Sequence, residues 1–247
     1  MTESIIRLAT KIYVTTPDTF TKKEYPPPER PKNQLGNPII WKLGTERLRN
    51  EGSALKYVNE HTTIPVPQVL HCGPDGDGVM SLTVEFVDGI LCEDVGDCCR
   101  MPPEKAHNTE GKCLECQELG FRNTNEFIET TVLPQLRSLS SDQTGLDGLV
   151  IPPPRILEFD NRATWNPKRS SSETPYVFCH GDLSRSNIIL DRETLTVKCI
   201  IDWECAGHYP AELEGNPWRL TYEEYMRTFQ DTDKIQREIS LIADKSS

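Results

Sequence analysis

Residues 177–207 read VFCHGDLSRSNIILDRETLTVKCIIDWECAG, and three polar residues stand out against the apolar runs: Asp182, Asn187 and Asp202. The β-prone runs 188–190 and 197–201 flank the polar DRETLT, which predicts a hairpin centred on residues 194–195. In that register Asn187 lies opposite Asp202, and directly opposed Cβ atoms are ~4.5–5.5 Å apart. An amide oxygen and a carboxylate are therefore expected to meet at the open end of the hairpin.

This pair of side chains has the chemistry of a magnesium site. Amide and carboxylate oxygens are hard ligands, and two of them together with phosphate oxygens commonly hold Mg²⁺. Asp182 precedes Asn187 by five residues and is predicted at the same end, where a base could accept a proton from a substrate hydroxyl. Each residue alone could be a turn cap or a strand end, but the three in this spacing favour catalysis. A Ser184–His180–Asp182 hydrolase triad is disfavoured because residues this close along a loop cannot form the relay.

The motif HGDxxxxN followed by IIDWE resembles the catalytic loop and metal-binding segment of the aminoglycoside phosphotransferase and choline kinase-like family. The run WECAGHYPAELEGNPWR is also similar, and the resemblance extends from about Pro38 to Arg219. It implies that Asp182 is the catalytic base, that Asn187 and Asp202 bind Mg²⁺, and that His180 braces the loop. It also implies an α+β, two-lobed, protein-kinase-like fold. A small β-rich N-terminal lobe would span 1–88, and a larger, mainly helical C-terminal lobe would span 89–247.

The N-terminal third has a strand-rich pattern. The sequence predicts a hairpin over residues 4–16 that turns at Ala9-Thr10, and then a polar loop over 17–37. A third strand (PIIWKL) is predicted over 38–43, a helix over 45–61 and a further strand over 79–87. Further along, a helical pattern is expected over 125–139 and an amphipathic helix from after Pro217 to about Ala243.

A kinase-like site also needs a lysine on the nucleotide phosphates and a glutamate that holds it. Glu51 falls on the inward stripe of the predicted helix, where a carboxylate is costly unless it is paired, and Lys42 is the expected partner. The resemblance implies that residues 84–87 link the lobes, so Glu85 and Phe86 mark the place where backbone groups would meet the adenine edge. No glycine occurs between Met1 and Leu35, so only the Ala9-Thr10 turn could cover the phosphates.

Composition narrows the class of protein. The chain of 247 residues has a net charge of −11, which argues against a nucleic-acid or anionic-membrane partner but not against a nucleotide bound with metal ions. No apolar run approaches the ~20 residues of a spanning helix, and the first residues do not have the pattern of a signal peptide. Nine cysteines, several inside apolar runs, fit reduced thiols in the cytoplasm better than disulfides.

The segment 90–122 contains five of these cysteines and is the least regular part of the sequence. Cys113-x-x-Cys116 has the spacing of a zinc knuckle, but the vicinal pair Cys98-Cys99 is a poor second half. The favoured interpretation is therefore a variable surface segment with free thiols.

The sequence thus predicts a Mg²⁺-dependent phosphotransferase that moves the γ-phosphate of ATP, or of GTP, to a hydroxyl of a small molecule. The alternative is a catalytically weak or inactive kinase-like binding or scaffold protein, which the glycine-poor phosphate turn would favour. A protein kinase is disfavoured because no glycine-rich loop is present. Three glutamates could form an acidic pocket for a cationic substrate, although such charges more often form a solvated face (Glu204, Glu212, Glu214). The acceptor and the oligomeric state are not specified by the sequence.

Overall fold

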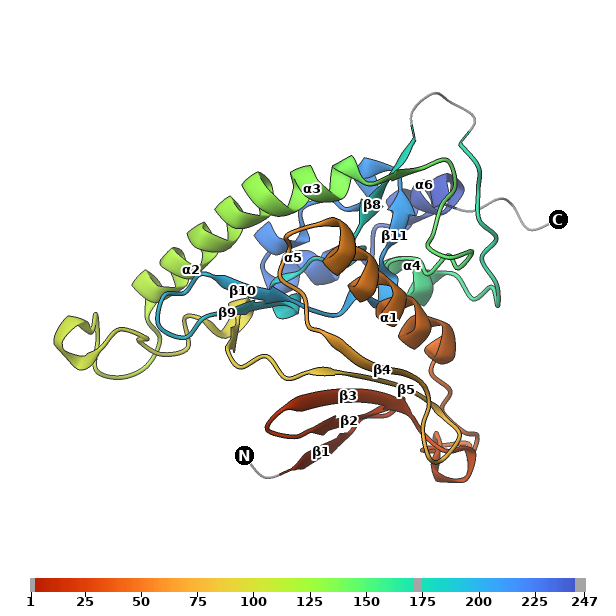
Figure 1. The fold of residues 1–247 in the computed structure, drawn as a ribbon, viewed down its shortest axis with the longest axis horizontal. Helices are drawn as coiled ribbons and strands as arrows, with labels where there is room; N and C mark the ends of the chain where they lie inside the picture. The colour runs from red at the N-terminus through yellow and green to blue at the C-terminus, as the bar shows by residue number, and fades with distance from the viewer. Residues whose placement is uncertain (1–2, 171–174, 243–247) are drawn as a thin grey trace.

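The computed structural model describes residues 3–170 and 175–242 and begins with a five-stranded antiparallel sheet (Figure 1). The strand order is β1-β2-β3-β5-β4, with bounds Ser4–Arg7, Lys11–Thr15, Thr19–Glu24, Met80–Glu85 and Val69–Pro74 respectively. The predicted first hairpin is confirmed, since the Leu8 N–H donates to the Lys11 carbonyl across the Ala9-Thr10 turn (3.0 Å). The strand predicted over 79–87 is also present, as β5.

The third strand lies elsewhere than the sequence predicted. β3 lies within the segment 17–37 that was predicted as a loop, whereas residues 38–43 form no strand and contribute one isolated bridge at Pro38. The prediction failed because TFTKKE contains one large apolar residue, Phe20, and therefore shows little apolar alternation. β3 forms because β2 and β5 pair with it on both sides and satisfy its backbone groups.

Helix α1 (Gly44–His61) matches the predicted helix and lies between the sheet and the rest of the chain (Figure 1). Its apolar stripe, Leu48, Leu55 and Val58, is buried. The Asn50 amide on the same helix donates to the carbonyls of Glu204 (3.1 Å) and Ala206 (2.8 Å). These bonds tie α1 to the segment that follows Asp202.

The second part of the chain has two small antiparallel sheets. One has the order β10-β9-β6 and the other β11-β8-β7. In chain order these strands are β6 (Ile90–Leu91), β7 (Ser140–Ser141), β8 (Tyr176–Cys179), β9 (Ile188–Leu190), β10 (Val197–Ile200) and β11 (Gly207–Tyr209).

The predicted hairpin is therefore present as β9 and β10, but its register differs from the prediction. Next to the turn Leu190 pairs with Val197, two residues before its predicted partner Cys199. A bulge between Val197 and Cys199 recovers one of these two residues, so Ile188 lies opposite Ile200. The carbonyl of Asn187 consequently accepts from the Ile201 N–H (3.0 Å), and Asp202 begins a turn with φ 65°. The turn therefore lies earlier in the chain than predicted, and the bulge, an extra residue on β10, corrects only part of this offset, which leaves Asn187 opposite Ile201 rather than Asp202.

The helices of this part begin and end differently from the predictions. Helix α2 (Leu114–Phe127) starts before the predicted residue 125 and continues through a π-helical turn (Ile128–Val132) into α3 (Leu133–Ser138). Pro134, which cannot donate a backbone hydrogen bond, is the second residue after the π turn. Helix α4 (Pro154–Phe159) precedes β8, and the single predicted C-terminal helix is two helices, α5 (Tyr222–Arg227) and α6 (Thr232–Ile242).

The main apolar core is formed by side chains of α1, β5, the β9–β10 hairpin, and the continuous helical segment from α2 to α3. Its largest fully buried side chains include Trp203 and Trp218, so the residue after Asp202 anchors this segment in the core. The chain is an α+β protein. Within the described ranges, no helix is both long and apolar enough to span a bilayer. All nine cysteines are described and none forms a disulfide.

Candidate active site

A buried lysine on β3 is the centre of the site. The Nζ of Lys22 lies 2.8 and 2.9 Å from the two carboxylate oxygens of Glu51 and also donates to Asp202. Burial lowers the pKa of Lys22, but the carboxylates of Asp202 and Glu51 outweigh burial and raise it well above the usual value. Burial raises the pKa of Asp202, but the cations of Lys22, Lys11 and Arg47 together outweigh burial and hold it below its ordinary range. Lys22 is therefore a fixed cation that joins α1 to the turn after β10.

Lys42 was expected in this position, and that pairing is wrong. Its Nζ donates to the carbonyls of Leu157 (2.8 Å) and Asp160, at the C-terminal end of α4. The last carbonyls of a helix have no partner within the helix, so a cation there satisfies them. Glu51 is buried and paired as the sequence predicted, but its partner is Lys22.

A second layer of charges surrounds this cluster. Arg47 on α1 donates to the buried carboxylate of Glu204, and the Lys11 Nζ lies 4.0 Å from the same carboxylate. Lys11 directly follows the Ala9-Thr10 turn, so this turn lies at the edge of the charged cluster. Lys11, Lys22 and Arg47 together face three carboxylates, those of Glu51, Asp202 and Glu204.

Asp182 lies in the loop before β9 and has two side-chain partners. The Asn187 amide donates to its carbonyl (2.8 Å) and its Oδ2 (3.2 Å), and the Tyr225 hydroxyl donates to its Oδ1 (2.7 Å). Burial raises the pKa of Asp182 to about 7, against the opposing hydrogen bond from Tyr225. No described residue donates to the Oδ1 of Asn187, so that oxygen remains available to a ligand.

The backbone around Asp182 is held by His180 and Glu214. The Nδ1 of His180 accepts from the Asp182 N–H (3.2 Å), so Nε2 carries the proton and donates to the Ile201 carbonyl (3.0 Å). Burial lowers the pKa of this imidazole to about 4, which keeps it neutral. The buried Glu214 accepts from the N–H groups of His180 (2.6 Å) and Gly181 (3.4 Å). With both ring nitrogens engaged by the backbone, His180 cannot activate Ser184, and a hydrolase relay is excluded.

Gly181 provides a test of how tightly this loop is constrained. Its φ is +83°, and a Cβ would lie 2.5 Å from the Cys205 carbonyl oxygen. Gly181→Ala should lower the free energy of unfolding by ~1–3 kcal/mol more than Gly78→Ala, because Gly78 shares the positive φ (+74°) but has open space around it. Urea unfolding of both variants measures the difference. Equal losses would show that the loop moves away from Cys205 at no cost.

Beside Lys22 lies a cavity of about 200 Å³ with mainly apolar walls. It is lined by residues of the sheet, α1, the β5 exit and the hairpin: Phe20, Lys22, Glu51, Leu55, Pro67, Leu82, Val84, Glu85, Phe86, Val87, Ile189, Ile201 and Asp202. Glu85 and Phe86, which the sequence predicted to lie beside the adenine edge, are in the wall of this cavity. Their N–H groups, however, donate to the carbonyls of Gln68 (2.9 Å) and Asp18 (2.8 Å).

A second, more polar cleft of about 570 Å³ lies on the Tyr225 side. It is lined by the start of α2, the loop after Asp182 and the start of α5: Glu93, Asp94, Gln117, Phe121, Ser184, Arg185, Ser186, Pro217, Leu220, Thr221, Tyr222 and Tyr225. Arg185 is fixed by the Trp218 carbonyl (2.8 Å) and stacks on Phe121, with 3.6 Å from its Cζ to the ring centre.

The three glutamates considered for an acidic pocket do not form one. Glu204 pairs with Arg47, Glu214 accepts hydrogen bonds from the backbone of the loop before Asp182, and Glu212 is exposed. Sequence reasoning also missed Lys22 and Tyr225. The signal for Lys22 was the alternation of Phe20, Lys22 and Glu24 on one face of a strand, whereas nothing local predicts that Tyr225 contacts Asp182.

Comparisons with known proteins identify the family of the chain. The sequence model of the phosphotransferase enzyme family matches residues 42–214. No curated protein matches the chain in sequence.

Among solved structures, the aminoglycoside phosphotransferase APH(4)-Ia has 11% identity and a TM-score of 0.52, with coverage of 97% of this chain and 79% of that one. A thermostable mutant of the same enzyme, in ternary complex with ADP and hygromycin B, has 9% identity, a TM-score of 0.52 and the same coverage. APH(3'')-Id from Streptomyces rimosus has 19% identity and a TM-score of 0.43, over 98% of this chain and 87% of that chain. The family match spans well over half of the sequence, and the chain therefore belongs to the phosphotransferase enzyme family.

Proposed function

We propose that this protein is a Mg²⁺-dependent phosphotransferase that moves the γ-phosphate of ATP or GTP to a hydroxyl of a small molecule. The observation that carries the proposal is the position of Lys22, which bridges Glu51 and Asp202 at the wall of an apolar cavity. Phosphoryl transfer depends on positioning and on charge neutralisation, and a fixed buried cation supplies both.

The apolar cavity suits the base of the nucleotide. Its walls include Phe20, Leu82 and Ile189. Because the N–H groups of Glu85 and Phe86 are already bonded, we assign the N–H of Val87 as the donor to the base edge. Val87 lines the same cavity, and no hydrogen bond of its N–H occurs among residues 3–170 and 175–242. In this proposal residues 1–88 bind the nucleotide and residues 89–247 bind the acceptor, as two lobes around the site.

The residues present fit a magnesium ion. Asn187 offers its free Oδ1, and Asp202 offers a carboxylate whose pKa is held low. Hard oxygen ligands of this kind suit Mg²⁺, which would neutralise charge on the phosphates when bound. Lys22 fixes Asp202 from the other side, so the carboxylate is oriented before a ligand arrives.

Asp182 is the proposed base. The Tyr225 hydroxyl that donates to Asp182 Oδ1 is an alcohol-type donor at 2.7 Å, and an acceptor hydroxyl would need a similar position to transfer its proton. The polar cleft next to Tyr225 therefore supports a hydroxylated small molecule as acceptor. The ADP and hygromycin B bound to a protein of the same fold are consistent with this division between nucleotide and acceptor.

A thermal-shift titration tests nucleotide binding directly. At a concentration ten times Kd, Mg·ATP or Mg·GTP should stabilise the fold by ~1.4 kcal/mol and raise Tm by about 3–6 °C. Mg²⁺ alone and Mg²⁺ with inorganic phosphate are the controls, because neither fills the apolar cavity. If neither nucleotide shifts Tm at millimolar concentration, the binding or scaffold alternative is favoured instead.

A further inference from the structure

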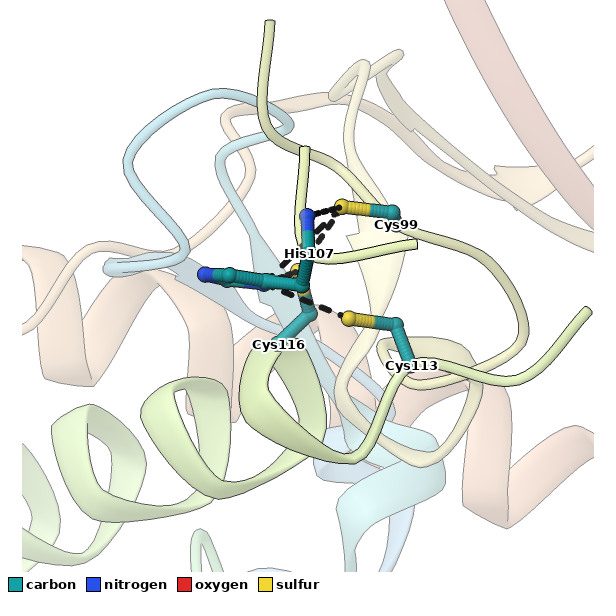
Figure 2. Close-up of side chains that lie close together, drawn as sticks. All are labelled: Cys99, His107, Cys113 and Cys116. Atoms are coloured by element: carbon teal, nitrogen blue, oxygen red, sulfur yellow. Dashed lines mark hydrogen bonds between the residues drawn. The ribbon is translucent and has the colours of Figure 1, made fainter. Parts of the chain in front are cut away.

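Outside the active site, three cysteines and one histidine of the irregular segment converge on a single point. Figure 2 shows Cys99, His107, Cys113 and Cys116 turned toward one another, just before and within the first turn of α2. Their ligand atoms all lie within 4.8 Å of one another. Sequence reasoning had paired Cys98 with Cys99 and missed the histidine; in the structure Cys98 is exposed and His107 completes the group.

We propose that Cys99, His107, Cys113 and Cys116 form a structural Zn²⁺ site. Tetrahedral zinc binds sulfur at about 2.3 Å and nitrogen at about 2.0–2.1 Å, so its ligands lie about 3.8 Å (S to S) and about 3.5 Å (S to N) apart. The Sγ atoms of Cys99 and Cys116 are 4.0 Å apart. The His107 Nδ1 is 3.3, 3.6 and 3.9 Å from the Sγ atoms of Cys113, Cys116 and Cys99 respectively. These separations match the edges of a zinc tetrahedron.

The backbone around the four ligands has the form of a metal-binding knuckle. The Arg100 N–H donates to the Cys116 Sγ, and the His107 N–H donates to the Cys99 Sγ, both at 3.3 Å. N–H donors of this kind orient the sulfur atoms toward a shared point, as the outer-shell contacts of metal ligands do. Three thiolates with one imidazole in a tetrahedral arrangement select Zn²⁺ over the harder divalent cations.

The segment that contains the ligands has few apolar contacts that could hold it in one conformation. Residues 97–112 are mainly polar and mainly exposed, with Met101 as their one large apolar side chain. Ordering such a stretch costs conformational entropy that burial of apolar surface cannot offset, and metal binding supplies this stabilisation in small motifs. Figure 1 shows the segment extending beyond the N-terminal end of α2, away from the five-stranded sheet.

The proposed zinc has a structural consequence for the polar cleft. The Cys113 N–H donates to the Gly96 carbonyl (2.9 Å), and Gln117, one residue after Cys116, lines the cleft together with Glu93 and Asp94. The metal would therefore hold the start of α2, which carries Gln117, next to the segment that contains Glu93 and Asp94. A distant metal without contact to Lys22 or Asp182 is a stabilising element rather than part of the reaction.

The test is the metal content of the full chain, purified without a metal-affinity tag. Mass spectrometry of the metal should find about one zinc per chain, and Co²⁺ exchange should give thiolate charge-transfer and tetrahedral d–d bands. Cys113→Ser should lose the metal, whereas Cys98→Ser, at a neighbouring exposed thiol that is outside the group, should retain it. Removal of zinc by a chelator should lower Tm by roughly 5 °C or more.

Cys113 is buried, so its variant could fail to fold for reasons of packing alone. His107 is exposed, and His107→Asn should fold while zinc affinity falls by more than the ~10–100-fold typical of losing an outer-shell partner. Absence of zinc together with absence of cobalt bands would overturn the proposal. So would equal zinc loss in Cys98→Ser and His107→Asn, or a disulfide that consumes two of the three thiols in the freshly purified protein. None of these readouts depends on phosphotransferase activity.

Discussion

Asp182→Asn is expected to lower kcat by ~10²–10⁴ while nucleotide binding is retained. The substitution keeps the shape of the side chain and removes its ability to accept a proton from the acceptor hydroxyl. Asp182 contacts Asn187 and Tyr225 and has no contact with Lys22, so the nucleotide cavity should be unaffected.

The measurement is the initial rate of ADP or GDP formation with an acceptor found by screening amino sugars, amino alcohols and hydroxylated metabolites. Tyr225→Phe is the matched control, because it removes one hydrogen bond to Asp182 and leaves the carboxylate in place. A single neutral hydrogen bond contributes ~0.5–1.5 kcal/mol, so this variant should change kcat by about tenfold or less. An undiminished rate in Asp182→Asn would remove this residue from the mechanism, whereas equal losses in both variants would assign Asp182 a positioning role.

The C-terminal part of the site could be predicted because the sequence pattern that indicates it lies within a short stretch of the chain. Asp182, Asn187 and Asp202 lie within 21 residues, and the strands around them are short apolar runs with a polar turn between them. The bulge at Lys198 could not be predicted, because side-chain patterning gives the strand period but not an extra residue in the ladder. The turn also lies earlier in the chain than predicted, and the bulge compensates for only part of that difference, so Ile201 rather than Asp202 faces Asn187.

The N-terminal part of the site was harder to predict, because Lys22 and its strand β3 are separated from α1 by a long irregular segment. Residues 25–43 carry most of the early prolines and end in PIIWKL, whose apolar run predicts a strand just before α1. In the structure Trp41 is instead buried, and the cationic groups of Lys11 and Arg47 lie over its ring. Pairing with β2 and β5 decides where β3 lies, and such contacts between distant segments are not visible in a local pattern.

The contrast between the two lysines gives the last test. Lys22→Met should lower kcat/KM by ~10²–10³, because it removes the cation proposed to contact the phosphates and releases Asp202 from its fixed orientation. Lys42→Met should leave the rate within a few-fold of the unaltered protein. It should instead reduce the free energy of unfolding by ~1–3 kcal/mol, because the α4 carbonyls lose their partner.

Lys22→Met also leaves the buried Glu51 without a partner, which could unfold the protein and reduce activity indirectly. The double variant Lys22→Met/Glu51→Gln removes that unpaired charge and should recover much of the stability without recovering the rate. Urea unfolding and steady-state rates of the four proteins separate the two effects. If the double variant regains activity together with stability, Lys22 acts only in the fold. If Lys42→Met loses as much activity as Lys22→Met, the assignment of the phosphate-binding lysine to β3 is wrong.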